Sequence, residues 1–160
     1  MWKRIKIVVV FVWFVTGNVC SQTDTPDWAY QRGLEIFEKQ ITEYYTKYAL
    51  GDEAFRVLYI QESPFVKNIP DSINGRPVQV LTDKNFKKYY RKNGWKLIQV
   101  EIRKSTLVEN RLEITFIPYH GTYYKEDGVR LELSDWTTVY FRWDPEVEIW
   151  MYDGVENKGM

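Results

Sequence analysis

Residues 97–103 read Leu-Ile-Gln-Val-Glu-Ile-Arg, and residues 111–116 read Arg-Leu-Glu-Ile-Thr-Phe. Apolar and polar side chains alternate in both segments, which is the period of a β-strand that buries one face. We therefore predict two paired strands of a sheet with one apolar face. Residues 104–110 connect them and leave several pairing registers open. The register that places Glu101 opposite Glu113 is unfavourable because it opposes like charges.

The same alternation continues to residue 152 and predicts a C-terminal hairpin around residues 144–146, Asp-Pro-Glu. With these three residues as the loop, Trp143 faces Val147 and the apolar side chains of both strands share one side. A two-residue loop would instead mix apolar with charged partners. The predicted register also makes Tyr140 and Trp150 cross-strand neighbours on the other side of the hairpin.

The N-terminal part of the chain predicts one long helix, over about residues 26–50. Thr25 can cap its first turn, Pro26 is tolerated at the first helical position, and Gly51 suits its end. Its apolar side chains recur at helical spacing, so they form one stripe. The stripe consists of Leu34, Phe37, Ile41, Tyr44 and Tyr48.

Shorter elements are predicted between the long helix and the alternating strands. Residues 55–61 and 76–81 have strand-forming side chains, and the Pro- and Gly-containing residues 63–77 predict a loop. A short helix follows, capped by Thr82 or Asp83. Its basic residues are interpreted as a solvated face rather than a nucleic-acid site. These residues are Lys84, Lys87, Lys88, Arg91 and Lys92.

Together these elements predict a single α+β domain over residues 22–154. The long N-terminal helix is expected to pack on a curved antiparallel sheet of about five or six strands, with one extra short helix. Residues 155–160 are expected to form a frayed tail.

The first residues have the pattern of a secretory signal peptide. The positive residues 3–6, Lys-Arg-Ile-Lys, precede an uncharged apolar run over residues 7–15. This run is shorter than the about 20 residues that a membrane-spanning helix needs. We expect residues 1–21 to be removed before Gln22 and the protein to be exported, either periplasmic or secreted.

Cys20 is the single cysteine of the chain and allows a second hypothesis about export. In a lipoprotein it would be the acylated first residue, although the preceding Val19 is bulkier than is usual there. Otherwise Cys20 leaves with the signal peptide. With a single cysteine, one chain can form neither an internal disulfide nor a cysteine zinc cage.

Composition excludes several classes of function. Lys plus Arg and Asp plus Glu both number 22, so no overall positive charge favours nucleic acid as a partner. The sequence lacks the phosphate-binding glycine loop, the paired histidines of zinc enzymes and the nucleophile elbow. His120 is the single histidine, which excludes a histidine-rich metal site within one chain. We therefore expect no cofactor and no metal.

Two titratable residues, Asp135 and His120, are the candidates for catalysis. Asp135 shares strand parity with Leu133 and Val139, so a straight strand would bury its carboxyl, raise its pKa and suit it as a general base. Alternatively, Ser134 and Asp135 form a turn and the carboxylate is solvated. His120 lies among tyrosines and is either a polar group at the mouth of an aromatic pocket or a surface histidine.

Four aromatic residues on the predicted outward side of the last strands are candidates for ligand binding. They are Trp136, Tyr140, Trp150 and Tyr152. Aromatic rings on one exposed face suit stacking on a sugar ring or packing against a partner protein. The alternative is that a helix, a loop or a second copy of the chain covers them.

The order of helix, strand, short helix and long antiparallel meander over residues 26–152 resembles the cystatin-like and nuclear-transport-factor-like superfamily. The resemblance is one of topology, without a diagnostic motif. Some members are isomerases or dehydratases with an acid and a His or Tyr inside a cone, so the resemblance implies Asp135 and His120 as the nearest counterparts. Many members only bind or dimerise. The chain also resembles small exported bacterial proteins, again without a motif that assigns chemistry.

The leading hypothesis is an exported binding or protein-interaction module without catalytic chemistry, whose partner is a protein or a glycan. The alternative is a small-molecule enzyme of the isomerase or dehydratase kind, with Asp135 as the base in an apolar cone pocket. A further alternative is a periplasmic immunity protein that blocks a toxin. A homodimer is left open. No nucleic-acid partner is expected, and no membrane-spanning segment after signal removal.

Overall fold

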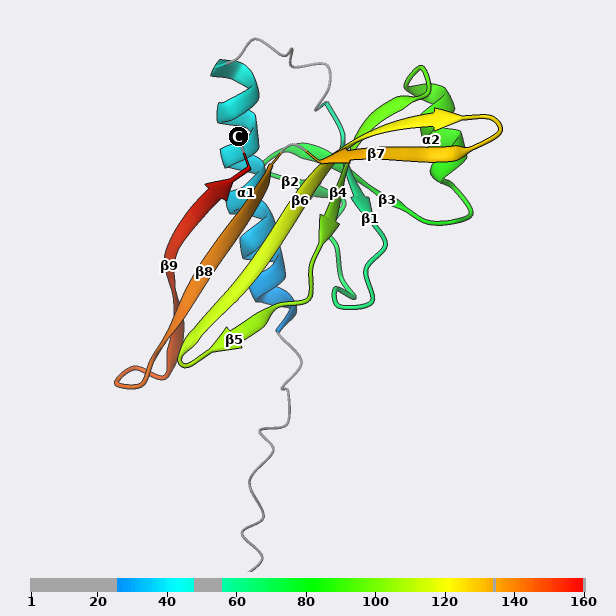
Figure 1. Ribbon diagram of the computed structural model, residues 1–160. Helices are drawn as coiled ribbons and strands as arrows, with labels where there is room; N and C mark the ends of the chain where they lie inside the picture. The colour runs from blue at the N-terminus through cyan, green and yellow to red at the C-terminus, as the bar shows by residue number, and fades with distance from the viewer. Residues whose placement is uncertain (1–25, 48–55, 134, 160) are drawn as a thin grey trace, which may run out of the picture.

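The computed structural model describes residues 26–47, 56–133 and 135–159. Two helices and nine strands form within these residues. Their arrangement can be followed in Figure 1. The helices are α1 (Asp27–Lys47) and α2 (Phe86–Lys92). The strands are β1 (Leu58–Gln61), β2 (Ser72–Ile73), β3 (Arg76–Leu81), β4 (Lys96–Ile102), β5 (Thr106–Val108), β6 (Arg111–Tyr124), β7 (Gly128–Leu133), β8 (Trp136–Asp144) and β9 (Ile149–Lys158).

All nine strands belong to one sheet that is organised around β6, its longest strand. The main order is β2-β3-β1-β4-β6-β8-β9, and β5 and β7 each pair with β6 as well. Residues 111–116 of β6 pair with β8, and residues 119–124 pair with β7. We call β5, β8, β9 and the first part of β6 the hairpin half. The remaining strands and the last part of β6 form the crossover half, which extends to the other side in Figure 1.

The predicted fold class is wrong. The sequence analysis expected an antiparallel sheet of about five or six strands under a helix, whereas the described residues form a nine-stranded mixed sheet. Strand β1 runs parallel to both β3 and β4. The additional strands β2 and β5 are two and three residues long, and they lie within segments that the sequence analysis interpreted as a loop and a connection. Strands this short carry too few residues to show an alternating pattern.

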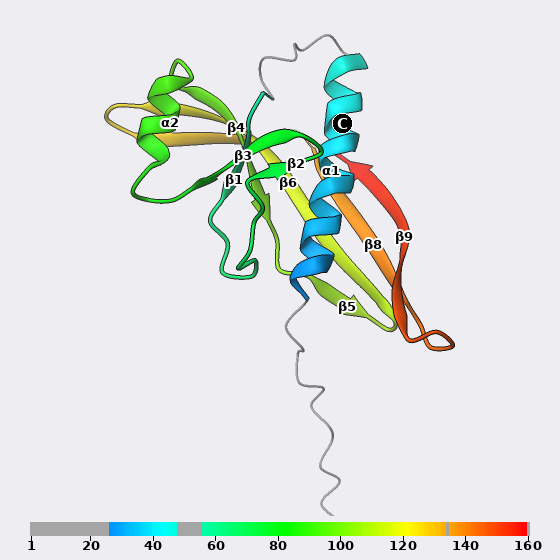
Figure 2. The same ribbon diagram turned by 180° about the vertical axis from the view of Figure 1, so that it is seen from behind.

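Helix α1 buries the stripe that its sequence predicts. Leu34, Phe37 and Ile41 are almost completely buried. The ring of Phe37 stacks on Phe116 of β6, with 5.3 Å between the centroids. Figure 2 shows α1 lying along the strands of the hairpin half. The helix starts close to its predicted start. The predicted cap Thr25, the predicted last turn over residues 48–50 with the stripe residue Tyr48, and Gly51 lie outside the described residues.

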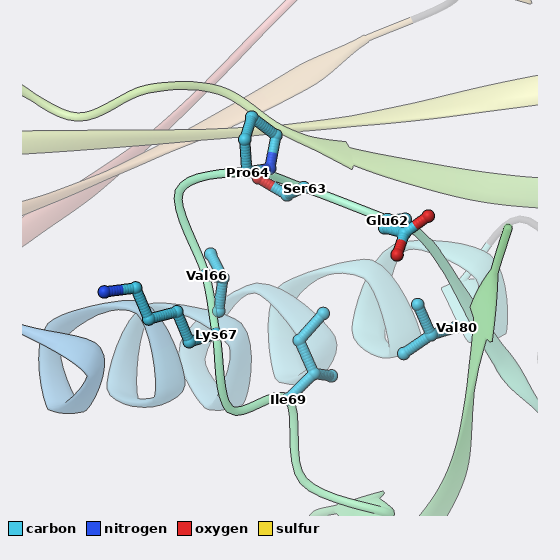
Figure 3. A pocket seen from close by; sticks show the side chains of 7 residues that line it. All are labelled: Glu62, Ser63, Pro64, Val66, Lys67, Ile69 and Val80. Atoms are coloured by element: carbon cyan, nitrogen blue, oxygen red, sulfur yellow. The ribbon is translucent and has the colours of Figure 1, made fainter.

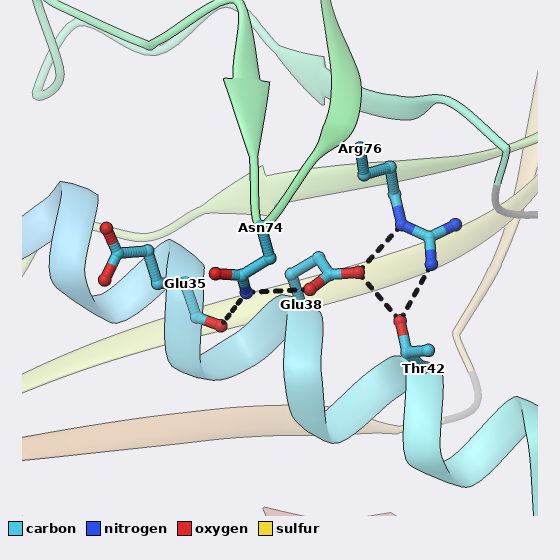
Figure 4. Close-up of polar contacts among 5 residues, drawn as sticks. All are labelled: Glu35, Glu38, Thr42, Asn74 and Arg76. Atoms are coloured by element: carbon cyan, nitrogen blue, oxygen red, sulfur yellow. Dashed lines mark hydrogen bonds and ion pairs between the residues drawn. The ribbon is translucent and has the colours of Figure 1, made fainter.

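A polar network ties α1 to the β2–β3 hairpin, as Figure 4 shows. The buried Glu38 carboxylate accepts hydrogen bonds from Asn74 Nδ2, Arg76 Nε and Thr42 Oγ1, each at 2.8 Å. Asn74 Nδ2 also donates to the Glu35 carbonyl oxygen at 2.8 Å. Asn74 has a φ of 49°, a left-handed conformation that asparagine tolerates better than most residues. The tight turn therefore positions Asn74 and Arg76, the two partners of Glu38 that the β2–β3 hairpin supplies.

Helix α2 connects β3 to β4 and packs on the face of β6 opposite α1. Tyr90 of α2 lies against Gly121 of β6, and Phe37 of α1 stacks on Phe116 of β6. Because Gly121 and Phe116 are separated by an odd number of residues along the strand, they lie on opposite faces of the sheet. The Tyr90 hydroxyl is buried and donates to Gln99 Oε1 at 2.9 Å. The structural cap of α2 is Asn85 rather than Thr82 or Asp83.

Gly121→Ala is expected to lower the free energy of unfolding by about 1–3 kcal/mol, the usual cost of overpacking a core. A Cβ atom at this position would lie 1.9 Å from the Tyr90 hydroxyl oxygen, so the ring must shift and release Gln99. Urea denaturation measures the loss. The same substitution should cost less in a Tyr90→Phe background, because the nearest atom is then absent. An equal cost in both backgrounds would contradict this packing.

The register of the β8–β9 hairpin differs from the prediction. Trp143 faces Trp150 instead of Val147, and Tyr140 faces Gly154 instead of Trp150. The loop is one residue longer than predicted, because the Asp144 carboxylate accepts the backbone N–H groups of residues 146 and 147 and so forms a local turn. A register shift next to Tyr140, where Phe141 faces Tyr152, leaves residue 153 as a bulge.

The end of the chain is ordered as a strand, so the predicted frayed tail is also wrong. Residues 155–158 continue β9, and Lys158 pairs with Trp136 at the start of β8. Thr137 Oγ1 donates to Asn157 Oδ1 at 2.7 Å, which adds a side-chain link to the backbone pairing. The tail consequently contributes to the hairpin half.

Candidate functional site

The two catalytic candidates of the sequence analysis lie close to the same residue, Tyr45. The Tyr45 hydroxyl lies 3.1 Å from His120 Nε2, and the negative charge of Asp135 acts on the same phenol. Asp135 is half-buried and lies between β7 and β8. The long helix therefore contributes Tyr45 to this cluster, a residue that was not among the candidates predicted from the sequence.

The Tyr45 cluster offers a neutral phenol rather than a base. Burial, followed by the charges of Asp135 and Tyr44, raises the pKa of Tyr45 to about 12. The phenol therefore stays protonated at neutral pH and donates or accepts a hydrogen bond with His120. The cone-type enzyme needs Asp135 inside an apolar pocket. Two depressions in the described part of the chain include neither Asp135 nor His120.

Both depressions lie in the crossover half and share Glu62. The first, of about 450 Å³, is shown in Figure 3. It is lined by Glu62, Ser63, Pro64, Val66, Lys67, Ile69 and Val80. The second, of about 430 Å³, lies beside the start of α2. Its lining residues are Gln61, Glu62, Leu81, Thr82, Asp83, Phe86, Gln99, Val129 and Leu131. Both are open to solvent.

Within the described residues, no group of three or more His, Cys, Asp or Glu side chains is placed to hold a metal ion. Neither described helix has the length and apolar character that crossing a membrane requires.

The four aromatic residues predicted to share a face do not do so. Tyr140 lies on the face opposite α1. The Arg111 guanidinium lies 3.7 Å from the centroid of the Tyr140 ring, and the Tyr140 hydroxyl donates a hydrogen bond to Glu156 at 2.7 Å. Trp136 has the same strand parity as Tyr140. Trp150 instead packs partly against the core on the α1 face. The predicted stripe depended on the predicted pairing of β8 with β9. The longer loop shifts this pairing by an odd number of residues, so the β9 side chains near the loop point to the other face of the sheet.

Tyr152 and Trp150 belong to a different group of aromatic residues on the α1 face. Tyr152 contacts Phe141 edge to face, with centroids 6.5 Å apart, and Trp28 of α1 contacts the same Phe141 ring at 5.6 Å. Trp150 contacts Trp143 at 5.6 Å between centroids. These rings lie near the start of α1 and near the loop that connects β8 to β9.

Exposed aliphatic residues occupy the other face of the same hairpin end. Ile149 and Met151 face Asp144 and Arg142, so they point away from α1, and Val147 lies in the loop. We call the whole group the hairpin patch. Its members are Trp28, Trp143, Val147, Ile149, Trp150, Met151 and Tyr152. The side chains of Val147, Ile149 and Met151 are 58%, 50% and 45% exposed, and those of Tyr152 and Trp28 are 52% and 42% exposed.

The sequence analysis missed five members of the hairpin patch. It placed Val147, Ile149 and Met151 on the same side of the hairpin as Trp143, and it did not name Trp28. One local signal was available: Asp144 followed by Pro145 is a common start of a turn longer than three residues, because the carboxylate accepts two backbone N–H groups.

Comparisons with known proteins add no assignment to this patch or to the Tyr45 cluster. No protein-family model matches the chain, and no curated protein or solved structure matches it. The resemblance to the cystatin-like and nuclear-transport-factor-like superfamily stays a prediction from the order of elements.

Proposed function

We propose that the protein is an interaction module that binds a partner protein through the hairpin patch. The observation that carries the proposal is the exposure of large apolar side chains on both faces of one hairpin end. Monomeric soluble proteins seldom expose contiguous apolar surface of this kind unless another surface covers it. Scattered single residues would need no such explanation.

The composition of the hairpin patch favours a protein over a glycan. A sugar-binding site needs a flat ring and polar groups beside it, whereas the α2-side face of this hairpin end presents the aliphatic Ile149 and Met151. Tryptophan, tyrosine and methionine are enriched in the cores of protein interfaces. A protein that encloses the hairpin end can contact both faces at once.

Charged residues border the hairpin patch and complete the pattern of an interface. The Asp153 carboxylate accepts a hydrogen bond from the Arg142 guanidinium at 3.0 Å and lies 3.7 Å from Arg111 Nε. These ion pairs are partly exposed, so they add little to stability. At the border of an apolar surface they suit a polar rim, which orients the partner more than it strengthens binding.

We also propose that the module works outside the cytoplasm, after removal of residues 1–21. The support is the order of positive charge, short apolar run and cleavage position in the sequence. The immunity-protein hypothesis is one form of this interaction module, with a toxin as the partner.

The proposal predicts that a photoreactive amino acid at Val147 cross-links a defined protein in the organism that makes this chain. The same label at the exposed Lys84, in the crossover half, is the control and should not capture that protein. Mass spectrometry identifies the captured species.

Ile149→Lys should abolish capture because it places a charge in the apolar contact. Tyr124→Lys changes an exposed aromatic residue at the end of β6 that pairs with β7, away from the patch, and should leave capture intact. Both variants should keep the wild-type melting temperature. Equal capture from Val147 and Lys84, or capture that survives Ile149→Lys, would contradict the proposal.

A further inference from the structure

Strand β7 lies at an edge of the sheet within the described residues and carries exposed apolar side chains. It pairs with β6 on one side, and no described strand pairs with its other side. Leu131 and Leu133 are 40% and 53% exposed. Figure 1 shows β7 and the end of β6 extending away from β8 and β9, so this edge is distant from the hairpin patch. An edge of this kind is a template for another strand.

The backbone groups of β7 that point to the free edge can be assigned from the pairing. Successive residues of a strand direct their N–H and C=O groups alternately to the two neighbouring strands. The Tyr123 N–H donates to the Trp95 carbonyl on the β4 side, at 2.8 Å. Thr122 therefore points to β7, where it forms a hydrogen-bonded pair with Arg130. The groups that point to the free edge belong to Val129, Leu131 and Leu133.

We propose that β7 pairs antiparallel with β7 of a second copy of the chain, with Leu131 of each copy opposite the other about a two-fold axis. Val129 then meets Leu133 of the partner subunit, so the edge residues form hydrogen-bonded pairs with one another. Their side chains lie on one face and are all apolar. On the other face, Arg130 meets Glu132 of the partner subunit, and the symmetry produces this pair twice.

The charges on β7 select this register over its neighbours. The backbone N–H and C=O groups that point to the free edge come from every second residue of β7. The free edges of two copies can therefore pair only in registers that differ by two residues along one strand. A step in one direction places Arg130 opposite Arg130 of the partner subunit. A step in the other direction places Glu132 opposite Glu132 of the partner subunit. Like charges directly opposite are unfavourable, whereas the proposed register opposes only unlike charges.

The residues that form these charge pairs are available. Arg130 and Glu132 are both exposed, and neither forms an ion pair within the described residues. Arg130 lies 5.5 Å from the centroid of the Tyr124 ring, which leaves its charge accessible. The other edges are less suited, because β2 and β5 have two and three residues and β9 contains a bulge. Charge complementarity thus favours a second copy over an unrelated strand.

Sedimentation equilibrium of the mature protein at micromolar concentration tests the proposal. The wild type should be a dimer. Arg130→Glu or Glu132→Arg alone opposes like charges at both symmetric positions and should weaken the dimer by about tenfold or more. The double variant Arg130→Glu with Glu132→Arg restores unlike pairs and should restore the dimer. A monomeric wild type, or a double variant no tighter than the single variants, would overturn the proposal.

Cysteine cross-linking of the mature protein, which lacks Cys20, tests the register. Leu131→Cys places two thiols opposite each other, with Cα atoms about 5.5 Å apart, within the range that a disulfide spans. Mild oxidation should therefore yield a covalent dimer. Leu133→Cys is the matched control: its two thiols would lie roughly 13 Å apart along the strands and should not join. Cross-linking of Leu133→Cys but not Leu131→Cys would reject this register.

This inference does not rest on the proposed function. The hairpin patch lies in the other half of the sheet, so Ile149→Lys should leave the dimer intact. Loss of the dimer in Ile149→Lys, with retention in Arg130→Glu, would show that the copies meet at the hairpin patch and would overturn the β7 proposal.

Discussion

Phe116→Ala should lower the free energy of unfolding by about 3–5 kcal/mol, the usual range for truncating a fully buried phenylalanine. Its ring is completely buried, stacks on Phe37 of α1, and lies against the backbone of Gly33. The substitution removes apolar contacts on both sides and leaves a cavity between helix and sheet. Because typical domains have only about 5–15 kcal/mol of stability, the variant should also fold to a lower yield.

Urea denaturation measures this loss, with the dependence of the unfolding free energy on urea concentration fitted separately for each variant. Phe116→Leu is the graded comparison, because it keeps most of the apolar volume and should cost less. Val108→Ala is the exposed control in β5 and should change stability by about 0.5 kcal/mol or less. A loss below about 1 kcal/mol for Phe116→Ala would show that α1 is not packed on this ring.

Local patterns predicted the elements that bury one face. The spacing of Leu34, Phe37 and Ile41 predicted a buried helical stripe, and the residues of β3 were predicted as a strand with the observed limits. Both predictions depend on neighbours within one element, and period 3.6 or period 2 is enough to define them.

The pairing of strands could not be predicted in the same way. Strand β1 reads Leu-Tyr-Ile-Gln and is buried on both faces, so its pattern is the same for parallel and antiparallel partners. The parallel pairing of β1 with β4 follows from the path of α2 over the sheet, which depends on the contact of Tyr90 with Gly121. That contact joins residues distant in the sequence, and no local period encodes it.

The candidate site shows the same division. Asp135 and His120 were found from residue type, and the structure places both near Tyr45. The prediction that Trp136, Tyr140, Trp150 and Tyr152 share one face was wrong because it depended on the pairing of β8 with β9. The predicted pairing differs by three positions from the observed one, and in the observed pairing Trp143 lies opposite Trp150. The turn formed by the Asp144 carboxylate and the bulge beyond Tyr152 decide that register, and both are properties of the folded hairpin.

Glu38→Gln should lower the free energy of unfolding by about 3 kcal/mol at pH 7, near the lower end of the cost of breaking a buried ion pair. Arg76 would lose its charge partner, and the new amide N–H₂ would face either Asn74 Nδ2 or Arg76 Nε, both of which are donors. The Arg76 side chain is 17% exposed, which moderates the cost. Glu35→Gln on the same helix is the control, because Glu35 pairs with Arg32 in solvent and should change stability by about 0–1 kcal/mol.

The dependence on pH distinguishes the charge of Glu38 from its shape. Burial raises the pKa of the Glu38 carboxyl, but hydrogen bonds from Asn74, Arg76 and Thr42 outweigh burial and hold the pKa below its ordinary value of 4.5. A group with a depressed pKa in the folded state stabilises it fully above the unfolded-state value, and this contribution is lost as the pH falls through the folded-state value. The difference between the wild type and Glu38→Gln in urea denaturation should therefore be constant above about pH 5.5, which is one unit above the ordinary value, and should narrow on further acidification. A difference that stays constant down to pH 3 would mean that the shape of the Glu38 side chain, and not its charge, holds α1 to the β2–β3 hairpin.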